Sequence, residues 1–146
     1  MYKIVSLFLF LTFLNAFGQT SKDEILGKWI ATDKSVAVDV YLDGNSFRAK
    51  VIWFDEQLGS GKPMNSRVDS ENPNVKLRHT KIIGMDVLEG LNYNSKNQRW
   101  ENGKIYDASS GRTWDSFAEI KKNGELCVRG YWKFKFIGKT LCFVRM

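Results

Sequence analysis

Apolar and polar residues alternate with a period of two along most of the chain from about residue 29 onward. In one run, Val36, Val38 and Val40 fall on one face while Asp39 and Tyr41 fall on the other. This alternation is typical of strands with one buried face. The runs that we interpret as strands are a first one that begins at Trp29 and then 36–43, 46–54, 80–91, 104–106, 112–121, 125–131 and 139–146.

Short turn signals separate these runs. Asp43-Gly44-Asn45 and Asn123-Gly124 predict hairpin turns, and Asp107–Gly111 predicts a tight loop. Eight or nine short strands at about ten-residue spacing indicate an all-β antiparallel barrel or sandwich. Before the first strand, Ser21 and Glu24 have capping-box spacing, so we expect one short helical turn that plugs the barrel.

The alternation stops between Asp55 and Val75, where glycine, serine, asparagine and both prolines gather. A connection this long in a compact domain is usually functional or mobile. Within it, Asp69 and Asn72 suit a side-chain-capped turn, and Asp107 suits another turn further along. We therefore take Asp69, Asn72 and Asp107 as candidates for the rim of a site, with a purely structural turn as the alternative.

The N-terminus has the pattern of a secretory signal peptide. An apolar run from Ile4 to Leu14 follows Lys3, and Ala16 and Gly18 are small residues at the positions that a signal peptidase reads. The run is too short to span a membrane. We expect residues 1–18 to be removed and residues 19–146 to form one domain, secreted or periplasmic, without a transmembrane anchor.

The charge of the chain is moderately basic. It carries 22 Lys and Arg against 16 Asp and Glu, and loss of Lys3 with the signal peptide would leave 21 against 16, or about +5. The basic residues are scattered, and the sequence has no recognised nucleic-acid module. We expect a solvated basic surface and no specific binding to nucleic acid. The sequence leaves the oligomeric state open.

The two cysteines fall on the last two expected strands. Cys127 and Cys142 are symmetric about the point between Phe134 and Lys135, where a hairpin would turn. A cross-strand disulfide and two free thiols are both compatible with this spacing. With His79 as its single histidine and no Cys-x-x-Cys, the sequence predicts no metal or redox site and no cofactor.

Gly27-Lys28-Trp29 at the first strand and Arg145 near the end resemble the signature of lipocalins and fatty-acid-binding proteins. The resemblance implies a single lipocalin-like β-barrel in which the first and last strands are neighbours. A cation at the end of the last strand can then lie across the tryptophan ring.

Four segments in order resemble an uncharacterised family of small secreted bacterial proteins, a domain of unknown function with a lipocalin-like barrel. They are Gly27–Trp29, Asp69–Pro73, Gly103–Gly111 and Leu126–Tyr131. The resemblance implies a fold and export, and no activity. This sequence departs from the family pattern at Asn102, at Ala108 in place of proline, and at Phe143 in place of tryptophan.

No pattern in the chain supports catalysis. A hydrolytic site needs a nucleophile with a base, or paired carboxylates in a cleft. His79 lies between Arg78 and Thr80 without any motif that marks half of a triad. We therefore expect no catalytic residue and no enzyme, and a small hydrolase is the weakest of the alternatives.

A barrel of about eight strands can hold one small ligand or fill itself with side chains. In the first case we expect a small hydrophobic or amphipathic ligand, covered by the loop 55–75. The residues predicted to contact it are Trp29, Trp53, Trp114, Arg129, Tyr131 and Arg145. Structural alternatives remain for both arginines, since Arg145 can lie over Trp29 and Arg129 can pair with a carboxylate.

In the second case the tryptophans fill the lumen. The protein is then an envelope-associated interaction module that acts through its outer face, where we expect Tyr41, Phe54 and Phe117.

Overall fold

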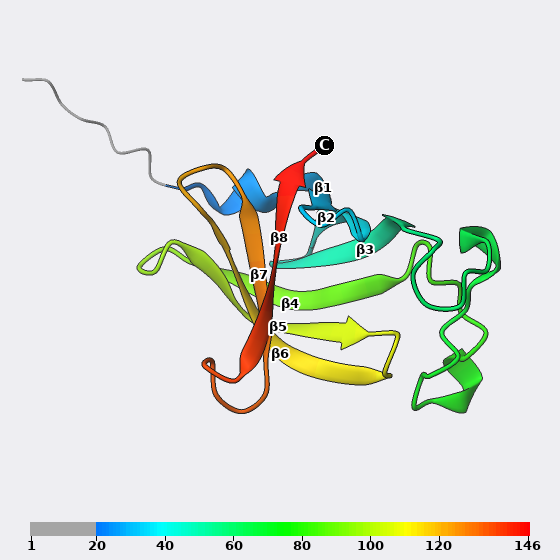
Figure 1. The fold of residues 1–146 in the computed structure, drawn as a ribbon. Helices are drawn as coiled ribbons and strands as arrows, with labels where there is room; N and C mark the ends of the chain where they lie inside the picture. The colour runs from blue at the N-terminus through cyan, green and yellow to red at the C-terminus, as the bar shows by residue number, and fades with distance from the viewer. Residues whose placement is uncertain (1–19) are drawn as a thin grey trace, which may run out of the picture.

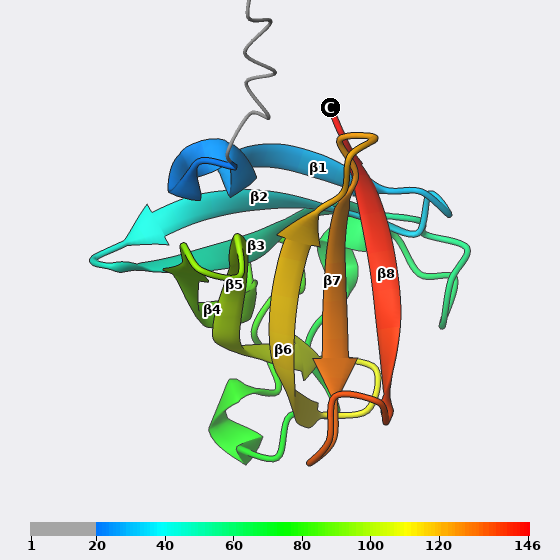
Figure 2. The same cartoon turned by 90° about the vertical axis from the view of Figure 1, so that its left-hand side faces the viewer.

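The computed structural model describes residues 20–146, which form a closed antiparallel barrel of eight strands in sequence order (Figures 1 and 2). The strands are β1 (Gly27–Ala31), β2 (Val36–Asp43), β3 (Ser46–Phe54), β4 (Asp86–Asn94), β5 (Arg99–Asp107), β6 (Arg112–Ile120), β7 (Leu126–Tyr131) and β8 (Gly138–Arg145). The predicted all-β barrel is confirmed. The predicted signal peptide, residues 1–18, lies outside the described residues. Within the described part of the chain, no helix has the length and apolar character needed to cross a membrane.

The barrel closes because β1 pairs with β8 as well as with β2. Trp29 stands opposite Arg145 on one side and opposite Val38 on the other. Closure removes the two free edges that an open sheet would expose. The prediction that the first and last strands are neighbours is therefore confirmed.

One end of the barrel is closed by the short 3-10 helix η1 (Lys22–Ile25). The predicted capping box forms, with Ser21 as its N-cap and Glu24 as the reciprocal partner. Ile25 is fully buried, and two indole N–H groups hold the backbone of this turn. Trp29 Nε1 donates to the Ile25 carbonyl at 2.8 Å, and Trp100 Nε1 donates to the Lys22 carbonyl at 3.0 Å. The Trp29 and Trp100 rings thus fill this end of the barrel, and their N–H groups bind the backbone of η1.

Side chains that point inward form one continuous core. Its buried members are Ile25, Trp29, Ala31, Val38, Val40, Phe47, Ala49, Leu88, Leu91, Trp100, Ala118, Leu126, Val128 and Phe143. Most of the large ones lie in the half of the barrel nearest η1. Burial of this apolar surface is the main source of stability in such a small domain.

The irregular segment between β3 and β4 packs beside the barrel (right side of Figure 1) and contains η2 (Met64–Ser66) and η3 (Val75–Leu77). The strand expected from residue 80 begins only at Asp86. Gly84 has a positive φ of 84°, and Met85 N donates to the Ile82 carbonyl, so residues 82–85 form a turn. Of residues 80–85, Lys81 alone makes a β-bridge, to Val68.

The strand β5 is longer than the pattern indicated, since it begins at Arg99 rather than at Lys104. Residues 98–103 read as a turn because Asn102 and Gly103 favour one. In the structure Asn102 has a φ of 62°, and the register shifts between Trp100 and Gly103. The turn residues therefore form a bulge inside the strand, because burial of the Trp100 ring holds the strand in the core.

Candidate functional site

The end of the barrel opposite η1 is less tightly packed than the end that η1 closes. Three large apolar side chains on inward positions there, Ile105, Trp114 and Leu141, are only half-buried. Ile105 stands opposite Trp114 in the register, and Leu141 stands opposite the buried Val128. An inward apolar side chain that still meets solvent indicates open space in front of it. We call the space bounded by Ile105, Trp114, Gly130 and Leu141 the cup.

The floor of the cup is made of small residues. Gly103, Ser116 and Gly130 lie side by side on β5, β6 and β7, all on the inward face. A Cβ atom on Gly130 would lie 3.7 Å from Trp114 Cβ and 3.8 Å from Ile105 Cδ1, so all three residues line one space. Because Gly130 has no side chain, this position adds no atoms to the space between Ile105 and Trp114.

Ser116 adds an unusual polar group under the cup. The residue is fully buried, and its hydroxyl has no hydrogen-bond partner among residues 20–146. Leaving a buried hydroxyl without a partner costs about 1–3 kcal/mol. The orphan hydroxyl lies within the row of small residues that forms the floor.

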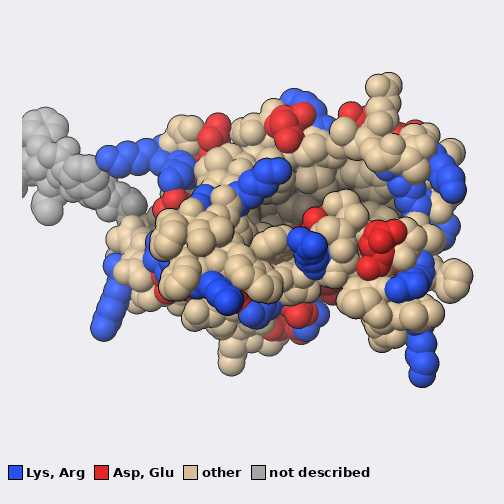
Figure 3. All heavy atoms as spheres, turned by 60° about the horizontal axis from the view of Figure 1, so that its bottom comes forward, with Lys and Arg blue, Asp and Glu red and all other residues tan. Residues whose placement is uncertain are grey.

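The mouth of the cup is bordered by the turn between β7 and β8. The Trp132 ring meets the Trp114 ring edge to face, with 5.9 Å between their centroids. Figure 3 shows the lower face of the molecule, which carries β6 and this turn in Figure 1, with a hollow near its middle and both basic and acidic side chains around it.

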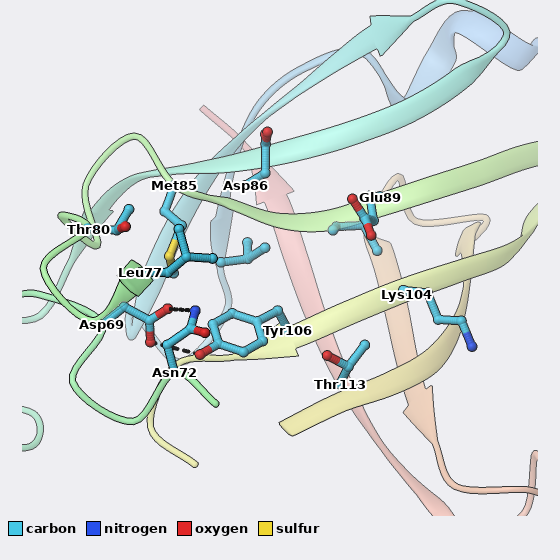
Figure 4. Close-up of a pocket in the computed structure, with 12 residues that line it drawn as sticks. Asp69, Asn72, Leu77, Thr80, Met85, Asp86, Glu89, Lys104, Tyr106 and Thr113 are labelled. Carbon is cyan, nitrogen blue, oxygen red and sulfur yellow. Dashed lines mark hydrogen bonds between the residues drawn. The ribbon is translucent and has the colours of Figure 1, made fainter. Parts of the chain in front are cut away.

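A second space of about 310 Å³ lies beside the barrel, between the start of β4, the end of β5 and the segment 69–85 (Figure 4). Leu88 belongs both to its wall and to the barrel core. Figure 4 shows Asp69, Asn72 and Tyr106 together on one side and Glu89 and Lys104 on the other. This side pocket is therefore polar at its rim and apolar where it meets the core.

Asp69 is the polar centre of the side pocket. Its side chain is fully buried, and it accepts hydrogen bonds from the Tyr106 hydroxyl at 2.8 Å and from Asn72 Nδ2 at 2.6 Å. Burial, together with the hydrogen bond to Asp69, raises the pKa of Tyr106 to about 12. The Tyr106 phenol therefore stays protonated at neutral pH and donates its hydrogen bond to Asp69.

The turn around Asp69 is seated on the turn between β5 and β6. A Cβ atom on Gly111 would lie only 2.0 Å from the Glu71 carbonyl oxygen. Asp107 shapes the same β5–β6 turn, because its carboxylate accepts from Ser109 N, Ser109 Oγ and Ser110 Oγ. Although burial opposes the change, these bonds hold the pKa of Asp107 below its ordinary value.

Two of the predicted ligand contacts lie far from the cup. Trp29 is only 1% exposed, and the Arg145 guanidinium lies 4.1 Å from its ring centroid. Arg145 also donates to the carbonyls of Leu26 and Glu24. The structure places both residues in the closed end, where they hold η1 against the barrel. Of the three predicted tryptophans, Trp114 lines the cup.

The inner face predicted for the end of β3 is wrong. The register shifts between Ala37 and Val38, so that Val38 stands opposite Val51 but Ala37 stands opposite Trp53. This bulge turns Trp53 to the outer face, where it is 36% exposed, and turns Phe54 inward, where it is buried. One extra residue in a strand exchanges the faces of all that follow.

Arg129 and Tyr131 also lie on the outer face, because they alternate along β7 with Val128 and Gly130, which face inward. Arg129 donates to the Lys135 and Phe136 carbonyls and to Thr140 Oγ1. Its predicted contact with a ligand inside the barrel and its alternative pairing with a carboxylate do not fit these partners. Tyr131 packs against the outward-facing Phe117.

Tyr41 was expected on the outer face together with Phe54 and Phe117. It does lie outside the barrel, and its hydroxyl donates to Asp86 Oδ1 at 2.6 Å. The sequence reasoning missed Ile105 and Leu141 as walls of the cup and Gly130 as part of its floor. Their signal was present, because each follows the period-two alternation of its strand, but alternation alone does not separate inward residues beside open space from those in the packed core.

The two cysteines form a disulfide between β7 and β8 on the outer face, with 4.1 Å between their Cα atoms. The one group of three potential metal ligands within residues 20–146 is Glu125 with these two cysteines. Because both sulfur atoms are joined to each other, the group offers no thiolate to a metal ion.

The chain matches a known protein family and is similar in fold to a solved structure. A family model described as "Uncharacterized protein conserved in bacteria (DUF2147)" matches residues 27–145. Among solved structures, the chain is similar to protein HP1028 from Helicobacter pylori, which is described as belonging to the lipocalin family. The two share 25% identity and a TM-score of 0.70, over 83% of this chain and 82% of that one. No curated protein matches the chain.

Proposed function

The chain belongs to the bacterial family DUF2147, and we propose that it is an exported, non-enzymatic carrier that holds one small amphipathic molecule in the open end of its barrel. The observation that supports this proposal is the cup. Inward apolar side chains remain half-exposed there, above a floor of small residues. Small-molecule sites are typically concave and mostly apolar, with a few placed polar groups.

The chemistry of the walls suggests the class of ligand. Ile105, Leu141 and the Trp114 ring offer an apolar surface for a chain or ring system. Polar groups occur at the rim of the side pocket, which shares Leu88 with the core. The apolar walls of the cup suit a hydrophobic or amphipathic molecule better than a fully polar metabolite.

The runner-up is a barrel that acts through its outer surface as an envelope-associated interaction module. It has one observation in its favour, since the half of the barrel nearest η1 is filled by Trp29, Trp100 and Phe47. If the open half were occupied in the same way in solution, no ligand would fit. Ligand occupancy therefore separates the two functions.

The first experiment is native mass spectrometry of the protein purified from the compartment that contains it, followed by denaturation and small-molecule analysis. We expect a stoichiometric amphipathic compound. An apo mass together with unchanged tryptophan fluorescence across a panel of amphipathic ligands would contradict the carrier function and favour the interaction module.

A matched pair of variants tests the location of the ligand. Trp114→Ala removes a wall of the cup and is expected to weaken binding at least about tenfold, since burial of apolar surface drives such binding. Trp53→Ala removes an equally large ring from the outer face and is expected to leave binding unchanged. Gly130→Val, which fills the cup without removing a contact, should also abolish binding, with Lys28→Val on the exposed face of β1 as its control.

Export is tested separately by cell fractionation and N-terminal sequencing. We expect the protein outside the cytoplasm with Gln19 as its first residue. Recovery of the full-length chain from the cytoplasm would contradict export and leave the ligand proposal to its own test.

A further inference from the structure

The turn between β7 and β8 exposes an unusual group of large apolar side chains. The exposed fractions are 55% for Trp132, 56% for Phe134, 78% for Phe136 and 51% for Ile137. Single exposed apolar residues are ordinary on a protein surface, but four within six consecutive residues make a contiguous patch. We call residues 132–137 the aromatic turn.

The backbone of the aromatic turn is held in place. Trp132 N donates to the Ile137 carbonyl, and Ile137 N donates to the Phe134 carbonyl, both at 3.0 Å. From the neighbouring strand, Arg129 Nε donates to the Lys135 carbonyl at 2.6 Å. The Phe134 and Phe136 rings stack with 5.5 Å between centroids, and both side chains are exposed. The structure therefore presents these side chains to solvent instead of folding them onto the core.

Basic residues accompany the aromatic ones. Lys133 and Lys135 alternate with the rings inside the turn, and Lys139 follows it. From Leu126 to Met146 the chain contains no Asp or Glu. The patch is thus apolar and cationic, with no acidic residue of its own segment to neutralise it.

We propose that the aromatic turn docks the protein on an anionic phospholipid surface. Aromatic rings settle at the level of lipid headgroups, where one part of the ring is apolar and another is wet. Lysines beside them reach the phosphates, because an anionic membrane surface attracts basic side chains. The rings of Phe134 and Phe136 would enter the headgroup region while Lys133 and Lys135 lie along it.

The shape of the turn favours a lipid surface over a protein partner. The turn projects from the end of a hairpin (bottom of Figures 1 and 2), so its exposed side chains lie at a projecting end of the molecule. A fluid lipid surface accommodates a projecting apolar end without a preformed pocket, whereas a protein would need a matching concave site. Charge complementarity with anionic headgroups points to the same occupant.

Docking would also orient the cup. Trp132 in the turn packs on Trp114 in the cup wall, so the mouth of the cup lies next to the docking surface. An amphipathic ligand could pass between lipid and cup over this short distance. The docking proposal does not depend on a ligand, because the turn is exposed whether the cup is empty or full.

The test is co-sedimentation of the chain from Gln19 onward with vesicles. This chain contains all eight strands and leaves out the apolar run 4–14, which would bind lipid by itself. We expect binding to vesicles of phosphatidylglycerol mixed with phosphatidylcholine, a blue shift in tryptophan emission, and weakening by salt. Binding to phosphatidylcholine alone should be at least about tenfold weaker.

Two double variants test the aromatic and the basic residues of the aromatic turn separately. Phe134→Ser with Phe136→Ser, and separately Lys133→Glu with Lys135→Glu, should each reduce binding to anionic vesicles at least about tenfold. The matched control, Leu58→Ser with Val75→Ser, removes two exposed apolar side chains from the segment between β3 and β4 and should leave binding unchanged. Circular dichroism melting checks that every variant folds.

Failure of the unmodified chain to bind anionic vesicles, or equal binding by the Phe134 and Phe136 variant, would overturn the proposal. Equal binding to neutral and anionic vesicles would overturn the claim that the docking surface is anionic. Ligand binding measured in the absence of vesicles should not change in the aromatic-turn variants, so the outcome is distinguishable from failure of the carrier function.

Discussion

The guanidinium of Arg145 lies 4.1 Å from the centroid of the Trp29 ring and joins the last strand of the barrel to the first. The same guanidinium donates to the Leu26 carbonyl at 2.8 Å and to the Glu24 carbonyl at 2.6 Å, so it also fastens η1 over the closed end. The Arg145 side chain therefore links β8 to β1 and also holds η1 over the closed end of the barrel.

We predict that Arg145→Ala lowers the free energy of unfolding by about 1–3 kcal/mol, through loss of the cation–π contact and of two charge-assisted hydrogen bonds. Urea denaturation measures the change. Lys28→Ala, at an exposed position on β1, is the control and should have little effect. Equal stability of the two variants would show that Arg145 does not hold the closed end.

Gly111 is the position where the β5–β6 turn meets the turn around Asp69. Gly111→Ala would place a methyl group 2.0 Å from the Glu71 carbonyl oxygen, in addition to the strain of a positive φ of 67°. We expect the segment 55–85 to be pushed away and to become sensitive to limited proteolysis.

The control for this change is Gly124→Ala. Gly124 also has a positive φ, 84°, but its Cβ would meet no atom within 4 Å. Gly124→Ala should therefore lower the free energy of unfolding through backbone strain alone, by about 1–2 kcal/mol. If both variants showed the same stability and the same cleavage pattern, the close packing of Glu71 on Gly111 would be contradicted.

The disulfide between Cys127 and Cys142 closes a loop with a sequence separation of 15. Constraint of the unfolded chain by such a loop contributes about 3 kcal/mol in the chain-entropy model. Cys127→Ala with Cys142→Ala should therefore be less stable by up to this amount while keeping the barrel fold. A reducing agent should lower the stability of the unmodified protein in urea and leave that of the double variant unchanged; any other pattern would show that the bond does not form.

Glu101, near the start of β5, accepts hydrogen bonds from Arg99 Nε at 2.6 Å and from Asn94 Nδ2 and Asn97 Nδ2 at 2.9 Å. The bond from Arg99 first, and then those from the two amides, lower the pKa of Glu101 from 4.5 to about 2. Because the pKa is lower in the folded state, the ionised carboxylate contributes stability above about pH 4.5, and this contribution is lost as the pH falls toward 2.

The variant Glu101→Gln should be less stable than the unmodified protein at neutral pH, by about 1–2 kcal/mol, since charged hydrogen bonds become neutral ones. Its stability should also change less between pH 5 and 2, a range that spans the two pKa values of Glu101. Thermal melts across this range measure both effects. The exposed Glu71→Gln is the control, and an unchanged pH profile in Glu101→Gln would assign the acid sensitivity to other groups.

Much of the fold can be predicted from the pattern of apolar and polar residues and from short motifs along the chain. Period-two alternation predicts strands because the backbone of a strand directs successive side chains to opposite faces. The end residues Trp29 and Arg145 indicate closure, and the symmetric spacing of Cys127 and Cys142 fits a hairpin pair. Ser21 and Glu24 indicate the capped turn of η1. Each of these inferences uses residues close in sequence, or a family resemblance that covers the whole chain.

The sequence by itself thus determined the all-β class, most of the strands and the capped N-terminal turn, because these depend on local backbone geometry. The starts of β4 and β5 differ from those expected. Only the tertiary structure decided that Trp53 faces outward and Phe54 inward, because one bulge between β2 and β3 reverses the faces of the residues that follow it. It also decided which end of the barrel is filled. That outcome depends on how side chains from distant strands share one interior volume, and alternation along a single strand carries no information about that volume.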